Sequence, residues 1–142
     1  MKHTILVIDG QGGGIGSRVI TELRAIMTDI TGWEITALGT NAQATGAMLR
    51  AGADAGATGE NPVVVNAPLA EIIIGPVGIV MANSMLGEIT PKTAEAIASS
   101  LATKILIPFN RCPVIIAGAE NGTLDSFIKK AAEHAVKQIT GK

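Results

Sequence analysis

The glycine-rich stretch Asp9–Gly16 carries the residues best suited to chemistry in this sequence. It follows an apolar run, Thr4–Ile8, and precedes a segment with helical spacing, Ser17–Met27. Glycines let the main chain approach an anion closely, and the start of a helix presents free N–H groups and the positive end of its dipole. A strand, this loop and a helix in succession therefore predict a phosphate or nucleotide site, with a tight structural turn as the alternative.

The residues expected to bind the ligand follow two predicted strands. Those of the first loop are Gly10, Gln11, Gly12, Gly13, Gly14 and Ile15. At the end of the second strand, Gly39, Thr40 and Asn41 stand where a dinucleotide enzyme often has an acid for the ribose hydroxyls. Thr40 and Asn41 could bind a ribose or a 2′-phosphate, although Asn41 also suits the N-cap of the next helix. The expected cofactor is NAD(P) or another nucleotide, and the expected partner a small phosphate-bearing ligand.

Other polar residues could complete the pocket, and none of them forms a recognisable catalytic set. The candidates are Asp9, Gly75, Asn83, Ser84, Asn110 and Arg111. The Asp9 carboxylate would repel a phosphate, so it is expected to bond to loop amides, with a cation bridge as the alternative. The only histidines, His3 and His134, lie far from Ser84 in sequence. No catalytic triad and no metal site is predicted, and catalytic residues stay unassigned.

Composition favours a sheet buried between helices. Hydrophobic residues make up 47% of the 142 residues, charged residues 16% and aromatic residues 2%, so the core must be aliphatic, as in parallel sheets. This length fits one domain, 1–142. A net charge of −1 gives no argument for nucleic acid or an anionic membrane. The apolar runs are too short to span a bilayer and no signal-peptide pattern is present, so we expect a cytoplasmic protein, with a homodimer covering some apolar surface.

Strands and helices are predicted to alternate along the chain. Strands are expected at Thr4–Ile8, Glu34–Leu38, a short piece within 53–59, Glu71–Ile74, Lys104–Ile107 and Val114–Ala117. Helices are expected after Gly16, Asn41, Thr90 and Thr123. Residues 61–70 are ambiguous between strand and helix, and a helix is favoured because parallel strands need a crossover there. The predicted fold class is α/β, a doubly wound, mainly parallel sheet with helices on both faces, Rossmann-like.

The spacing Gly10-x-x-x-Gly14-Ile15-Gly16 resembles the nucleotide-binding signature of short-chain dehydrogenases, Thr-Gly-x-x-x-Gly-Ile-Gly. Asp9 replaces the threonine of that signature. The resemblance implies a nucleotide site but does not extend to the catalytic residues. That family uses a Tyr-x-x-x-Lys pair, and this chain contains no tyrosine. An ordinary short-chain dehydrogenase is therefore excluded.

A second resemblance covers almost the whole chain. The blocks IDGQGGGIG, ALGTNA, AGADAGATGEN, IIIGPVGI, ANSMLGEITP, AEAIASS and KILIPFNRC are similar to those of a family of small bacterial proteins of unknown function. The resemblance implies a compact cytoplasmic protein. It indicates no reaction and no catalytic residues for this chain. An enzyme, a binder or sensor, and a structural or interaction protein with a tight glycine turn all remain open at this point.

Overall fold

The computed structural model describes residues 2–109 and 113–141. Within these ranges one sheet holds five parallel strands in the order β3-β2-β1-β4-β5. They are β1 (His3–Asp9), β2 (Trp33–Gly39), β3 (Ala55–Thr58), β4 (Ile72–Pro76) and β5 (Thr103–Ile107). This sheet confirms the predicted doubly wound α/β class. The chain order changes direction between β1 and β4, which is the place where such sheets bind ligands.

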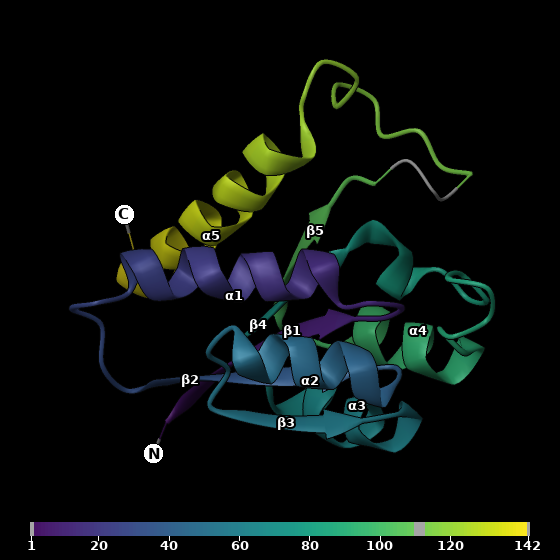
Figure 1. The fold of residues 1–142 in the computed structure, drawn as a ribbon, viewed down its shortest axis with the longest axis horizontal. Coiled ribbons are helices and arrows are strands. Elements are labelled where there is room, and N and C mark those ends of the chain that lie inside the picture. The colour runs from purple at the N-terminus through teal and green to yellow at the C-terminus, as the bar shows by residue number, and fades with distance from the viewer. Residues whose placement is uncertain (1, 110–112, 142) are drawn as a thin grey trace.

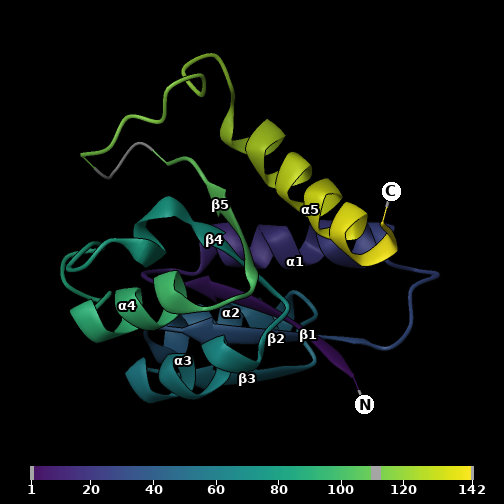
Figure 2. The same cartoon turned by 180° about the vertical axis from the view of Figure 1, so that it is seen from behind.

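Helices connect the strands and cover both faces of the sheet. They are α1 (Gly14–Ile26), α2 (Ala42–Arg50), α3 (Glu60–Asn66), α4 (Pro91–Ser99) and α5 (Leu124–Thr140), with the 3₁₀ turns η1 (Ala67–Leu69) and η2 (Val77–Val80). Figures 1 and 2 show α1, α2 and α5 on one face and α3 and α4 on the other. The favoured helix within 61–70 is thus confirmed. No helix in the described ranges is long and apolar enough to cross a membrane.

The central strand β1 divides the core into two halves because successive side chains point to opposite faces. Ile5 and Val7 pack in the cluster that includes α1, α2 and α5 residues, whereas Leu6 and Ile8 pack in the cluster with α3 and α4. All four side chains are fully buried. A continuous apolar strand is therefore needed at this position, and it holds the glycine loop at the end of a rigid element.

Polar side chains cap the helices where the sequence predicts. Asn41 accepts a hydrogen bond from the Ala44 amide at 2.9 Å and begins α2. Thr90 caps α4, and Thr123 forms a capping box at the start of α5. Each cap accepts a hydrogen bond from a backbone N–H that has no acceptor within the helix. These helix starts can therefore be predicted from the local sequence.

The strand predicted at Val114–Ala117 is wrong. The described segment 113–123 contains no strand and lies apart from the sheet as it leads to the start of α5 (Figure 1). Val-Ile-Ile has high strand propensity, but a strand needs a neighbouring edge to pair with. The segment follows β5 too directly to make the long crossover that a parallel neighbour of β5 would require. Ile115 consequently stays 88% exposed.

Candidate functional site

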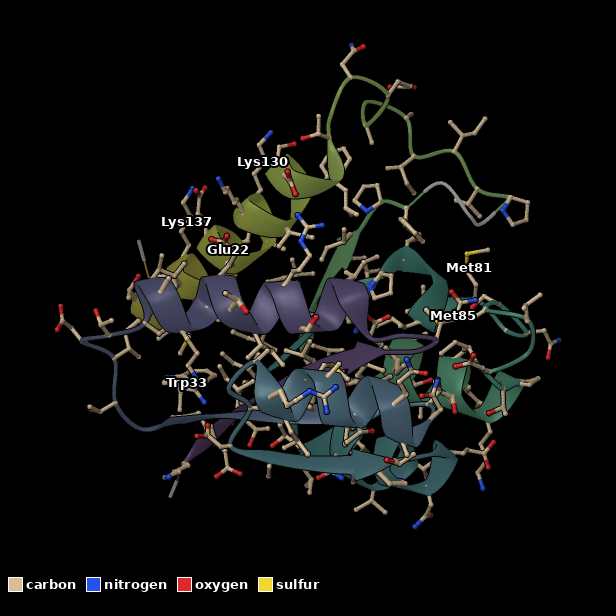
Figure 3. The ribbon with its side chains drawn as sticks, viewed as in Figure 1. Glu22, Trp33, Met81, Met85, Lys130 and Lys137 are labelled. Atoms are coloured by element: carbon tan, nitrogen blue, oxygen red, sulfur yellow. The ribbon has the colours of Figure 1, made fainter. Side chains whose placement is uncertain are left out.

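A pocket of about 590 Å³ lies at the carboxyl ends of β1 and β4, where the chain order of the sheet changes direction. This volume is within the usual range of small-molecule sites. Its walls come from the β1–α1 loop, the end of β4, the loop before α4, and the two ends of the β5–α5 connection. They include Asp9, Gly10, Gln11, Gly12, Gly14, Ile15, Arg18, Pro76, Gly78, Met85, Leu86, Phe109 and Leu124. Figure 3 shows Met85 beyond the N-terminal end of α1, whereas Trp33 lies at the opposite end of the molecule.

Asp9 closes the β1–α1 loop on itself. Its Oδ1 accepts a hydrogen bond from the Gly10 amide at 2.8 Å, and its Oδ2 accepts one from the Gly16 amide at 2.7 Å. The side chain is 4% exposed. Burial raises the pKa of the Asp9 carboxyl, although these amides and that of Ile15 act in the opposite direction. The predicted carboxylate-to-amide bonding is confirmed.

Two glycines of the loop are required by neighbouring protein atoms. At Gly10 an added Cβ would lie 2.6 Å from Thr40 Oγ1, closer than real side chains approach. Gly13 has a φ of +73°, which side chains rarely adopt, and its Cβ would lie 2.8 Å from Ala44 Cα. These positions are glycine because the chain packs tightly around them, so they do not by themselves indicate a ligand.

Gly12 and Gly14 differ from these two, because nothing in residues 2–109 and 113–141 requires glycine at either position. A Cβ added at either residue would meet no atom of the described residues within 4 Å, and neither glycine has a positive φ. Both line the pocket. Their amides have no hydrogen-bond acceptor in the described part of the chain. Both residues therefore leave open space in the lining of the pocket, and each has an N–H group that is not used within the described part of the chain.

Glu88 ties the β1–α1 loop to the β2–α2 loop. Its Oε1 accepts hydrogen bonds from the Gln11 amide at 2.9 Å, from Thr40 Oγ1 at 2.5 Å and from Asn41 Nδ2 at 2.9 Å. Burial raises the pKa of the Glu88 carboxyl, but the three hydrogen bonds, from Thr40 above all, outweigh it and hold the pKa below its ordinary value. Thr40 and Asn41, predicted to bind a ribose, both use their side chains on this carboxylate.

The lowered pKa of Glu88 predicts a loss of stability in acid. The charged form is stabilised only in the folded chain, so its contribution is complete above the ordinary pKa and is lost as pH falls through the lower folded value. We expect the free energy of unfolding of wild type minus that of Glu88→Gln to be constant near neutral pH and to shrink below about pH 4.5. Urea unfolding at a series of pH values measures this difference. A difference that grows on acidification would contradict the assignment.

Arg18 is a pocket residue that the sequence analysis missed. It lies one turn beyond Gly14 on α1, lines the pocket and forms an ion pair with Asp125 of α5. Its side chain is 46% exposed. The sequence spacing could have indicated this residue. Arg18 follows Gly14 by four residues, and residues four apart lie on the same face of a helix. Its cation therefore lies beside the N-terminus of α1. Arg18 is the only cationic side chain among the described residues that line this pocket.

The remaining predicted residues separate into three groups. Gly75 is buried in β4, where an added Cβ would collide with the Ile8 carbonyl of β1. Asn83 and Ser84 lie in the loop before α4, where Ser84 Oγ donates to the Gly78 carbonyl at 2.5 Å, but among described residues the loop lines the pocket through Met85 and Leu86. Asn110 and Arg111 lie outside the described residues.

Comparison with solved structures supports the fold. The chain is similar to a dodecameric FMN-dependent Ubix-like decarboxylase from Escherichia coli O157:H7, with a TM-score of 0.53 and 14% identity over 99% of this chain and 94% of that one. It is also similar to the FMN-dependent cysteine decarboxylase TvaF from thioviridamide biosynthesis, with a TM-score of 0.49 and 11% identity over 96% and 88% of the two chains. At 14% identity, the likeness to the first of these structures is one of fold.

No curated protein matches the chain. A family model does match, over residues 4–140, which is nearly the full length. That family is described as a domain of unknown function, DUF3842. The match agrees with the expectation of a family of unknown function drawn from the sequence blocks. The chain belongs to the DUF3842 family.

Proposed function

We propose that this protein binds a phosphate-bearing ligand of the nucleotide class in the pocket between the ends of β1 and β4. The observation that carries the proposal is the pair Gly12 and Gly14, which neither backbone angles nor neighbouring atoms require to be glycine. A phosphate in that space would accept hydrogen bonds from their amides at the positive end of α1. The Arg18 guanidinium would place a positive charge beside the same phosphate.

The walls of the pocket favour FMN as the first ligand to test. Met85, Leu86, Phe109 and Leu124 give the cavity an apolar side, which suits a flat ring system more than a bare phosphate. FMN is also the cofactor in the name of the structural neighbour with the same fold, and that neighbour is dodecameric. A bound flavin would supply electron or hydride transfer, while the protein would hold and orient it. NAD(P) is the second candidate, and a homo-oligomer remains part of the proposal.

Thermal unfolding in the presence of FMN, NAD, AMP or inorganic phosphate tests the proposal. A ligand at a hundred times its Kd stabilises the folded state by about 2.7 kcal/mol. For a chain of this size that corresponds to a rise in Tm of roughly 8 °C. We expect FMN to give a rise that grows with its concentration. If no phosphate compound raises the Tm at millimolar concentration, the proposal fails and the glycine loop serves only as a turn.

A further inference from the structure

The carboxyl end of β2 is closed by a side chain from a distant segment. Glu88 lies in the loop between η2 and α4, and its Oε1 takes all three hydrogen bonds that Gln11, Thr40 and Asn41 direct toward it. In a dinucleotide-binding sheet, the end of β2 is where the ribose of the adenosine half is held. Here the Gln11 amide and the side chains of Thr40 and Asn41 are already paired within the protein.

The path from the glycine loop to the end of β2 is also filled. It passes Gly10, where an added Cβ would lie 2.6 Å from Thr40 Oγ1, 2.7 Å from Met85 Sδ and 3.0 Å from Glu88 Oε1. A dinucleotide must lay its pyrophosphate along this path to reach both halves of the site. The pocket extends the other way, past Pro76 toward Phe109 and Leu124 of the β5–α5 connection.

The loop that carries Glu88 is held in an unusual backbone conformation. Asn83, Met85 and Leu86 have φ values of 67°, 56° and 56°, a region that costs residues other than glycine free energy. Such a conformation persists only where surrounding contacts enforce it. The hydrogen bonds to Glu88, together with the one from Ser84 Oγ to the Gly78 carbonyl, supply those contacts. They fix Met85 and Glu88 over Gly10.

We propose that Glu88 is a specificity-determining residue, which restricts the site to mononucleotides by occupying the place of a dinucleotide's second ribose. This inference rests on the proposed function and narrows it to one ligand class. It has two physical parts. The carboxylate blocks the space at the end of β2, and its negative charge repels the additional phosphate that a pyrophosphate or a 2′-phosphate would bring there.

The test is the ratio of the Kd values for NAD and FMN, measured by titration calorimetry. In wild type we expect NAD to bind at least tenfold more weakly than FMN. Glu88→Ala empties the end of β2 and frees Thr40 and Asn41, so the ratio should fall at least tenfold. Glu88→Gln keeps the block and an acceptor oxygen for the three donors but removes the charge, so the ratio should fall by less than it does in Glu88→Ala. Glu95→Ala removes an exposed glutamate of α4, outside the site, and should leave the ratio unchanged.

The possible outcomes distinguish a failure of the inference about Glu88 from a failure of the proposed phosphate binding. If wild type binds NAD as tightly as FMN, the inference about Glu88 is wrong while phosphate binding stands. The same conclusion follows if Glu88→Ala folds and binds FMN but binds NAD no more tightly than wild type does. A wild type that binds neither compound overturns the proposed function and the inference with it. If Glu88→Ala does not fold, Met85→Ala opens the same path beside Gly10 and is expected to lower the ratio in the same direction.

Discussion

A Gly14→Val variant is expected to fold as wild type does and to lose FMN binding. Gly14 is the first residue of α1, and a Cβ placed there meets no atom within 4 Å in the part of the chain that the structure describes. A branched side chain would instead occupy the space in which the proposed phosphate sits. It would also keep the phosphate from the Gly14 amide. We expect the Kd for FMN to rise by about a hundredfold, equal to about 2.7 kcal/mol of binding free energy.

Two measurements are needed, because binding can also be lost through unfolding. Circular dichroism and the Tm without ligand should match wild type within a few degrees, since valine is no poorer a helix former than glycine. The Tm with FMN should then show no rise. Gly12→Ala tests the neighbouring open position with a smaller side chain and should weaken binding less. Wild-type affinity in Gly14→Val would place the phosphate elsewhere.

A Gly13→Ala variant is expected to lose stability, in contrast to its neighbours. Gly13 has a φ of +73°, and its added Cβ would lie 2.8 Å from Ala44 Cα and 2.9 Å from the Ala44 carbonyl oxygen. The left-handed conformation costs alanine about 1–2 kcal/mol, and crowding against the backbone of α2 adds about 1–3 kcal/mol. We expect the free energy of unfolding to fall by roughly 2–5 kcal/mol.

Urea unfolding measures this loss as a lower midpoint with an unchanged slope. Gly12→Ala is the matched control, because it makes the same chemical change one residue away without any close contact. If Gly13→Ala has the same midpoint as Gly12→Ala, the division of the loop into packed and open glycines is wrong. The two predictions together therefore distinguish a tight turn from a ligand cradle.

Most of the fold can be predicted from the sequence because its determinants are local. The side-chain caps Asn41, Thr90 and Thr123 act within three residues of themselves, so they mark the starts of α2, α4 and α5. The strand at Val114–Ala117 failed for the opposite reason. A strand depends on an edge contributed by another part of the chain, and local propensity carries no information about that edge.

The site was less predictable than the fold. Gln11 and Glu88 are 77 residues apart, and nothing in their local sequence indicates that they share a hydrogen bond. The prediction for Thr40 and Asn41 therefore did not take into account that Glu88 engages both. Arg18 could have been found from its spacing to Gly14. Phe109 follows β5 and Leu124 begins α5, and sequence order alone does not show that both residues line one pocket.

We propose above all that the amides of Gly12 and Gly14 bind the phosphate of a nucleotide-class ligand. A titration of isotope-labelled protein with FMN, followed by nitrogen–proton correlation NMR, observes those amides directly. We expect the Gly12 and Gly14 peaks to move most along the β1–α1 loop, and inorganic phosphate to move the same peaks at higher concentration. Saturation with FMN that shifts peaks elsewhere, while Gly12 and Gly14 stay in place, would contradict it.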